Sequence, residues 1–109
     1  MNPRIEKISH VLDMNKAENI EVFDLQGTDY FADYVVIATS LGERHTFALL
    51  DHLKRGLKPD EEFLAIDESG DWIAIDLGDI LIHVLTPQYR SIYDLESFLR
   101  EIAARKNKA

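Results

Sequence analysis

Residues 72–85 read WIAIDLGDILIHVL, two apolar runs separated by a Gly-Asp pair. Both runs, Trp72–Leu77 and Ile80–Leu85, are short and apolar, which favours strands, and the tight connection through Gly78–Asp79 predicts an antiparallel hairpin. A third apolar run, Phe63–Ile66, precedes them across a polar connection and predicts a second hairpin. This stretch therefore predicts three consecutive antiparallel strands.

Upstream of these strands, the sequence predicts two more strands and two helices. The strands are Ile20–Leu25 and Asp33–Ser40, and the second is almost entirely apolar, as in a strand covered on both faces. Helical spacing of apolar residues predicts helices over Asn2–Met14 and Glu43–Leu57. The apolar stripe of the second helix is formed by Phe47, Leu49, Leu50, Leu53 and Leu57.

A closing helix is predicted at the C-terminal end, where apolar residues again recur at helical spacing from Leu95 to Ala103. The element order is then α-β-β-α-β-β-β-α. Five strands and three helices predict an α+β fold with a mixed five-stranded sheet and helices packed against it. We expect one domain over residues 1–109, with its core at about residues 3–100 and a basic tail at residues 101–109.

The composition excludes several classes of protein. The 109 residues include no cysteine, so disulfide scaffolds and thiolate metal sites are excluded. The apolar runs are far shorter than the roughly 20 residues of a membrane span, and the N-terminus lacks the apolar core of a secretion signal. We expect a cytoplasmic protein without a membrane partner.

The negative charge leaves two interpretations open: it keeps the protein in solution, or it steers the protein towards a basic partner. Twelve Lys and Arg residues against 20 Asp and Glu residues give a formal net charge of −8. Ten of the acidic residues, and a single base, lie between Pro59 and Glu96. Because nucleic-acid affinity comes mainly from Lys and Arg on phosphates, sequence-specific binding to nucleic acid is not expected.

No catalytic or cofactor motif is present. The five glycines are too widely spaced for a dinucleotide fingerprint or a phosphate loop, and there is no G-x-S-x-G elbow. Ser40 and Gly42 resemble the start of a nucleotidyltransferase signature, but no Asp-x-Asp metal pair follows. The sequence therefore predicts neither an enzyme nor a cofactor or metal site.

Polar-tipped aromatic residues are concentrated near the last hairpin and the closing helix. Trp72, Tyr89 and Tyr93 are near Asp76, Arg90 and Glu96 in the sequence, and Trp, Tyr and Arg are enriched at protein–protein hot spots. The spacing alone leaves open whether these side chains belong to the core or to a contact surface.

Several segments carry a resemblance to a known family. They are KAENI at residues 16–20, DYVVIAT at 33–39, GDWIAIDLGDILIHV at 70–84, and the R-x-x-Y-x-L-E pattern of residues 90–96. In these segments the chain resembles the ribosomal silencing factor family, RsfS, also called Iojap. The resemblance implies a fold similar to that of nucleotidyltransferases but without their catalytic carboxylates.

The resemblance also implies a function. Members of this family bind the large ribosomal subunit through the fourteenth protein of its L series, block joining of the small subunit and repress translation when nutrients are scarce. Homodimers off the ribosome are implied as well. Two other functions remain open from the residues: a nucleotide-binding or vestigial nucleotidyltransferase-like enzyme, and a dimeric adaptor with a partner other than the ribosome.

On this interpretation, Trp72 and Tyr93 are the expected anchors of the contact with the ribosomal protein. Polar and charged complementarity is expected from Asp76, His83, Arg90 and Glu96. A second rank of expected contact residues comprises Asp33, Tyr34, Arg44, His45 and Tyr89.

Overall fold

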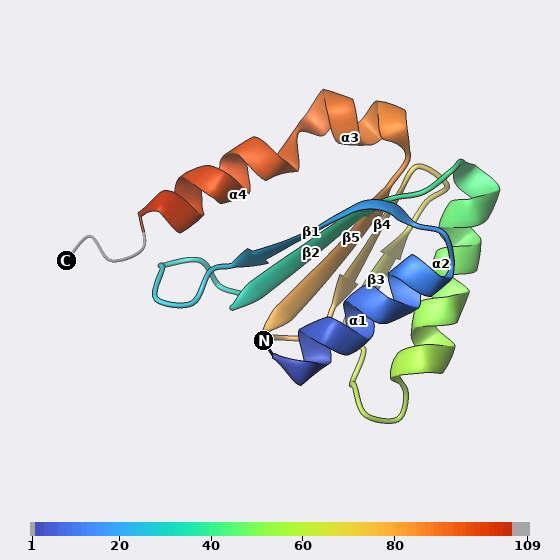
Figure 1. The fold of residues 1–109 in the computed structure, drawn as a ribbon, viewed down its shortest axis with the longest axis horizontal. Helices are drawn as coiled ribbons and strands as arrows, with labels where there is room; N and C mark the ends of the chain where they lie inside the picture. Colours follow the sequence, from blue (N-terminus) through green and yellow to red (C-terminus); the bar gives the residue numbers. More distant parts are fainter. Residues whose placement is uncertain (1, 106–109) are drawn as a thin grey trace.

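The computed structural model describes residues 2–105 and shows helices on both sides of one five-stranded sheet (Figure 1). None of the helices in this range has the length and apolarity needed to cross a bilayer. The elements follow in the order α1 (Pro3–Met14), β1 (Glu18–Asp24), β2 (Tyr34–Thr39), α2 (Glu43–Leu57), β3 (Ala65–Glu68), β4 (Trp72–Asp76), β5 (Ile80–Leu85), α3 (Pro87–Tyr93) and α4 (Leu95–Ala104).

The strand order of the sheet is β1-β2-β5-β4-β3. β2 and β5 pair in parallel, and every other neighbouring pair is antiparallel, which confirms the predicted mixed sheet and both predicted hairpins. β2 is buried along almost its whole length, as expected for a central strand with helices on both faces. The fold class predicted from the sequence is therefore confirmed.

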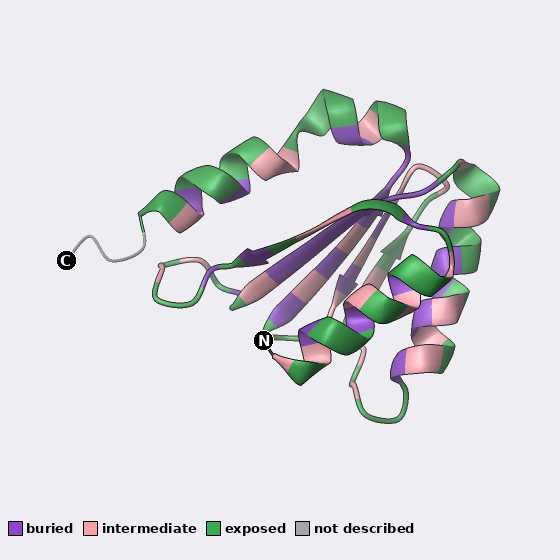
Figure 2. Ribbon diagram, viewed as in Figure 1, coloured by how far each residue is buried: buried purple, intermediate pink, exposed green. Residues whose placement is uncertain are grey.

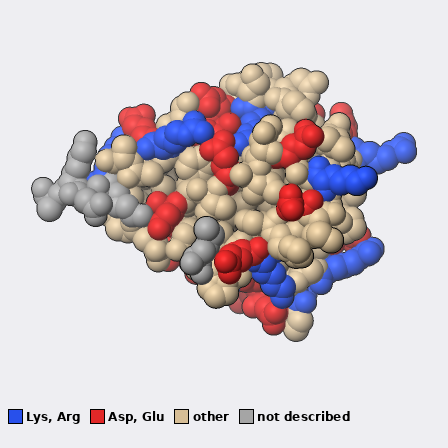
Figure 3. Space-filling view, in the orientation of Figure 1, with Lys and Arg blue, Asp and Glu red and all other residues tan. Residues whose placement is uncertain are grey.

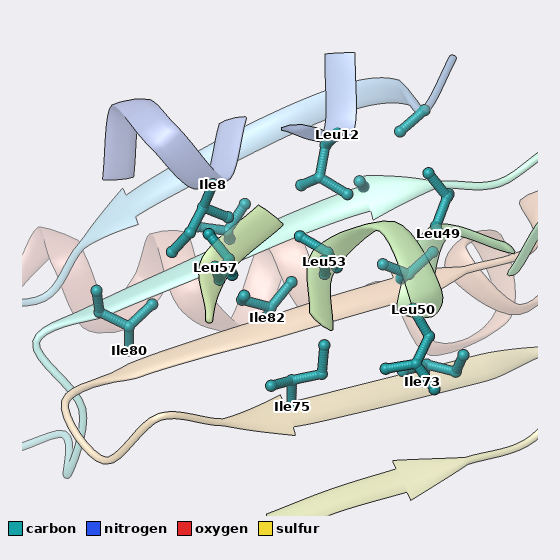
Figure 4. Close-up of a cluster of buried hydrophobic side chains, with 14 of the residues drawn as sticks. Ile8, Leu12, Leu49, Leu50, Leu53, Leu57, Ile73, Ile75, Ile80 and Ile82 are labelled. Atoms are coloured by element: carbon teal, nitrogen blue, oxygen red, sulfur yellow. The ribbon is translucent and has the colours of Figure 1, made fainter. Parts of the chain in front are cut away.

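The larger core lies between one face of the sheet and helices α1 and α2 (Figure 4). Ile8 and Leu12 of α1 and Leu53 of α2 point onto Ile73, Ile75, Ile80 and Ile82 of the strands. The stripe predicted for α2 is wrong at one position, because Phe47 is 46% exposed and the buried residue of that turn is Thr46. Thr46 enters the core with its hydroxyl bonded to the carbonyl of Gly42 at 2.9 Å and within 2.6 Å of the Ser40 hydroxyl.

The second face of the sheet is only partly covered. Leu99 and Ile102 of α4 pack on Phe23 and Leu25 of the β1 region and on β2, and they form a smaller core. Figure 2 shows buried residues on the sides of α3 and α4 that face the sheet, and exposed or partly exposed residues over the rest of both helices. The part of this face formed by β4 and β3 has no helix over it (Figure 1).

The C-terminal region differs from the prediction, because two helices stand where one was expected. Pro87 occupies the first turn of α3, a position that suits proline. Asp94 then adopts a left-handed conformation, with φ 45° and ψ 52°, and separates α3 from α4. Residues 101–104 of the predicted tail belong to α4, and its residues 106–109 lie outside the described part of the chain.

The third strand also begins two residues later than predicted. The apolar run at residues 63–66 indicated the strand, but β3 extends to Asp67 and Glu68 and pairs Ala65 with Asp76. β3 is an edge strand whose acidic side chains are exposed, so their polarity does not oppose pairing.

We expect Leu53→Ala to lower the free energy of unfolding by about 2–5 kcal/mol, because it leaves a cavity in the larger core. Leu53 is fully buried, whereas Phe47, on the same helix, is 46% exposed. Phe47→Ala is the matched control, and we expect it to cost less than about 1 kcal/mol. Urea denaturation of both variants measures the difference, and equal losses would contradict this assignment of the buried face of α2.

Candidate contact surface

The uncovered part of the second face carries side chains from three strands. Alternation along β4 places Trp72 and Ala74 on this face and buries Ile73 and Ile75 in the larger core. Ala74 pairs with His83 on one side and with Asp67 on the other, so these three side chains lie in one row. Together with Tyr89 of α3 they line a hollow of about 500 Å³, which we call the aromatic groove: Asp67, Glu68, Ser69, Trp72, Ala74, His83 and Tyr89.

Aromatic rings form one wall of this groove. The centroid of Trp72 lies 5.0 Å from that of Tyr93, and Tyr93 lies 5.6 Å from Tyr89. Trp72 is half-buried and Tyr93 is 53% exposed. The structure therefore brings Trp72, Tyr89 and Tyr93 together at the surface, with large apolar area and polar tips available to a partner.

His83 is held in the groove as a neutral side chain. The indole N–H of Trp72 donates a hydrogen bond to its Nδ1 at 3.1 Å, so this nitrogen carries no proton. Burial lowers the pKa of His83 from 6.5 to about 4. At neutral pH His83 thus adds polarity to the groove without adding charge.

The acidic segment between Pro59 and Glu96 divides into paired and unpaired carboxylates. Arg4 donates hydrogen bonds to Glu61 and to Asp79, and its bond to Asp79 lowers the pKa of that carboxyl. Asp76, half-buried, accepts a hydrogen bond from the backbone N–H of Gly78 at 2.7 Å and so supports the β4–β5 turn. Within the described residues, Asp67 and Glu68 form no ion pair, and both are exposed at the groove.

The sequence patterns did not identify Asp67 and Glu68 as candidate contact residues. The register of the β3–β4 hairpin could have found Asp67, because it is opposite Ala74 and residues opposite each other in a sheet project to the same face. Glu68 is opposite the buried Ile73 and lines the groove at the end of β3, which the register does not predict. Acidic and basic side chains are interspersed in Figure 3 rather than gathered by sign. At the groove itself, the acidic side chains are those of Asp67 and Glu68.

Arg90 and Glu96, which the sequence pattern assigns to the contact set, lie in an internal ion-pair network. The Arg90 side chain is 9% exposed and that of Glu96 is 15% exposed. Arg90 Nε donates to Glu96 at 3.0 Å, and Arg90 Nη2 donates to Glu21 at 2.9 Å. Neither side chain has much surface left for a partner.

The second-rank residues, apart from Tyr89, lie away from the groove. Tyr34 is opposite Ile80 and Trp72 is opposite Leu85, so Asp33 and Tyr34 lie at the other end of β5 from Trp72. Arg44 is exposed on α2, which covers the other face of the sheet. His45 links two segments, since its Nδ1 accepts from the N–H of Leu41 and its Nε2 lies 2.8 Å from the carbonyl oxygen of Asn15.

A second hollow, of about 710 Å³, lies at the carboxyl ends of β2 and β5. In open α/β sheets, ligands bind where the chain leaves neighbouring strands towards opposite faces, as it does here. The hollow is lined by Glu21, Asp94 and Glu96 against a single base, Arg90. Nucleotide phosphates would meet an excess of negative charge there, and no cluster of three metal-binding side chains exists among residues 2–105.

Known proteins resemble this chain along nearly its whole length. A family model described as "Ribosomal silencing factor during starvation" matches residues 1–108. The chain is 33% identical over 95 residues to the ribosomal silencing factor RsfS of Zymomonas mobilis, which covers 84% of this chain and 71% of that protein. It is 26% identical over 98 residues to a mouse protein named mitochondrial assembly of ribosomal large subunit protein 1, over 84% of this chain and 43% of that protein.

A solved structure has the same fold. The crystal structure of a protein from Chromobacterium violaceum superposes with a TM-score of 0.82 and 25% sequence identity, over 88% of this chain and 82% of that chain. The relatives from Zymomonas mobilis and mouse are named for a role at the ribosome and not for a catalysed reaction.

We expect His83 to make the folded protein less stable in acid. The unfolded chain takes up this proton near pH 6.5 and the folded chain only near pH 4, so acidification through this window favours unfolding, by up to roughly 3 kcal/mol. His83→Asn keeps a hydrogen-bond acceptor near Nδ1 but does not titrate, and should therefore lose this part of the pH dependence. Urea denaturation at intervals between pH 7 and pH 4 measures it, and identical pH profiles for the variant and the parent chain would refute the expectation.

Proposed function

Because this chain belongs to the ribosomal silencing factor family, we propose that it represses translation by binding the large ribosomal subunit and blocking the joining of the small subunit. The landing site we propose is a basic ribosomal protein, the fourteenth of the L series. The name of the mouse relative, which refers to assembly of the large subunit, supports this choice of subunit. The setting is nutrient limitation, and the location is the cytoplasm, where the subunits join.

The observation that carries the proposal is the aromatic groove on the uncovered part of the sheet. Trp72 and Tyr93 supply area that a partner can bury, and His83 supplies a polar group. Asp67 and Glu68, which form no ion pair within residues 2–105, place two carboxylates at the rim. This combination suits a partner surface that is basic at its edge and apolar at its centre.

The net charge of −8 favours a protein landing site over ribosomal RNA. Phosphates would repel an acidic protein, whereas a basic ribosomal protein attracts it and raises its association rate. Repression then requires no catalysis. A bound protein that occupies the subunit interface excludes the other subunit by its volume, provided that its affinity competes with subunit joining.

A homodimer off the ribosome is part of the same proposal. The groove leaves aromatic surface exposed to water, and a second copy that covers it would remove that surface from solvent. Sedimentation velocity of the purified chain tests this point, with a dimer as the expected species.

The main test is sucrose-gradient sedimentation of the protein with separated ribosomal subunits. We expect the protein to move with the large subunit and the joined ribosome peak to decrease. Protein that stays at the top of the gradient, while the subunits join normally, would overturn the proposal.

We expect truncation of the aromatic anchors to weaken binding strongly. Trp72→Ala and Tyr93→Ala should each cost about 2 kcal/mol or more, roughly a 30-fold loss of affinity for the large subunit. Phe31→Ala is the matched control, because Phe31 is an aromatic residue that is 70% exposed in the β1–β2 connection and lies outside the groove. Normal binding by a folded Trp72→Ala variant would refute the assignment of this surface.

The rim carboxylates should act mainly on the association rate. We expect the double variant Asp67→Asn and Glu68→Gln to bind about threefold to tenfold more slowly at low salt, and to approach the parent chain at high salt as the charges are screened. Surface plasmon resonance with immobilised large subunits over a series of salt concentrations measures this. An association rate equal to that of the parent chain at every salt concentration would show that these acids do not face the partner.

A further inference from the structure

Helix α3 carries two aromatic residues of the contact surface, Tyr89 and Tyr93, yet the one residue that it buries is Arg90. Short helices are usually held by apolar side chains, because isolated helices of this length are unstable in water. α3 has seven residues, and its buried side chain is charged. The contacts of this arginine therefore fasten the helix that carries the two tyrosines.

We propose that Arg90 is a positioning residue: its guanidinium holds α3 so that Tyr89 and Tyr93 lie against Trp72, and it acts on partner binding through those rings without touching the partner. The test of this proposal by binding to the large subunit rests on the proposed function. The positioning itself is a property of the free protein and can be measured without a partner.

The guanidinium is bonded on three sides. Besides the bonds to Glu96 of α4 and Glu21 of β1, Nη1 donates to the hydroxyl of Thr39 in β2 at 2.8 Å and to the carbonyl oxygen of Asn19 in β1. Four hydrogen bonds thus join α3 to two strands and to α4. Because the guanidinium is planar and its donors are fixed in direction, these four acceptors specify both the place and the orientation of the side chain.

Lysine cannot reproduce this arrangement. Its ammonium group is a single point with three donors, while the four acceptors here surround three different nitrogen atoms. A lysine at this position keeps the positive charge between Glu21 and Glu96 but loses the fork that connects them. Arg90→Lys therefore keeps the positive charge and removes the directional hydrogen bonds.

Besides Arg90, the restraint on α3 comes from Tyr89, which is half-buried against the smaller core. Gln88, Ser91 and Ile92 are exposed, and Ile92 is 71% exposed. The left-handed residue Asp94 interrupts the helical path into α4, so α3 is not held as an extension of the longer helix. Loosening of the Arg90 contacts should thus shift the tyrosine rings relative to Trp72.

Trp72 serves as a spectroscopic probe of α3, and Arg100 serves as a control residue. Trp72 is the single tryptophan, and it lies 5.0 Å from Tyr93, so its near-ultraviolet circular dichroism and its quenching by acrylamide report the position of α3. Arg100 pairs with the same Glu21, at 2.8 Å, but its side chain is 58% exposed and it belongs to α4. Arg100→Lys is therefore the matched control for Arg90→Lys.

The first measurement compares these two variants in the absence of ribosomes, below the unfolding temperature of each. We expect Arg90→Lys to retain its helical circular dichroism while Trp72 becomes more accessible to acrylamide and loses near-ultraviolet signal. Arg100→Lys should match the parent chain. If Arg90→Lys does not fold, Glu96→Ala provides the same test, because it leaves Arg90 in place and removes the acceptor of its Nε. An unchanged Trp72 signal in the folded Arg90 variant would overturn the proposal.

The second measurement is a double-mutant cycle of large-subunit binding. We expect Arg90→Lys to weaken binding about tenfold in the parent chain and less than twofold in a chain that already carries Tyr89→Ala and Tyr93→Ala, since the arginine acts through these rings. A tenfold loss in both backgrounds would mean that Arg90 contacts the partner directly, and would overturn the proposal. If the parent chain itself does not bind large subunits, the proposed function fails, and the Trp72 measurement alone decides the role of Arg90.

Discussion

The parallel pairing of β2 with β5 is the constraint on which the rest of this structure depends. Parallel neighbours cannot be joined by a tight turn, so the chain between them leaves the sheet through α2 and returns through the β3–β4 hairpin. This path commits α2, together with α1, to one face and leaves the other face to the segment after β5. That segment is a short pair of helices, of which only α4 has an apolar stripe that packs on the sheet.

The candidate contact surface is a consequence of that unequal coverage. α4 covers the part of the second face formed by β1 and β2, so alternation along β4 and β5 brings Trp72, Ala74 and His83 to an open surface. Helix α3 stands beside these side chains and contributes two tyrosines. The surface is therefore assembled from a strand hairpin and a helix whose relation depends on the polar contacts of Arg90.

Sequence patterns predict most of the fold because its apolar residues follow regular periods. Apolar runs or helical spacing predict the five strands and helices α1 and α2, and the short connections between the runs predict both hairpins. Residue type alone identified Trp72, Tyr89 and Tyr93 as a group. α3 escaped prediction because its buried residue is an arginine, which no hydrophobic period reveals. The bonds of Arg90 to Thr39 and Glu21 join residues 51 and 69 positions apart, and pairings at such distances depend on the assembled sheet. The role of Asp67 depends in the same way on the register between β3 and β4.

The brevity of β3 has a further consequence for the protein at high concentration. An open apolar sheet face beside a free strand edge invites edge-to-edge pairing of copies into aggregates. β3 is four residues long, and two of those residues, Asp67 and Glu68, are exposed acids. A second copy approaching along this edge would bring like charges together over a ladder too short to compensate for the repulsion. The two carboxylates that we propose to attract a basic partner thus also oppose the pairing of copies of this chain into one extended sheet.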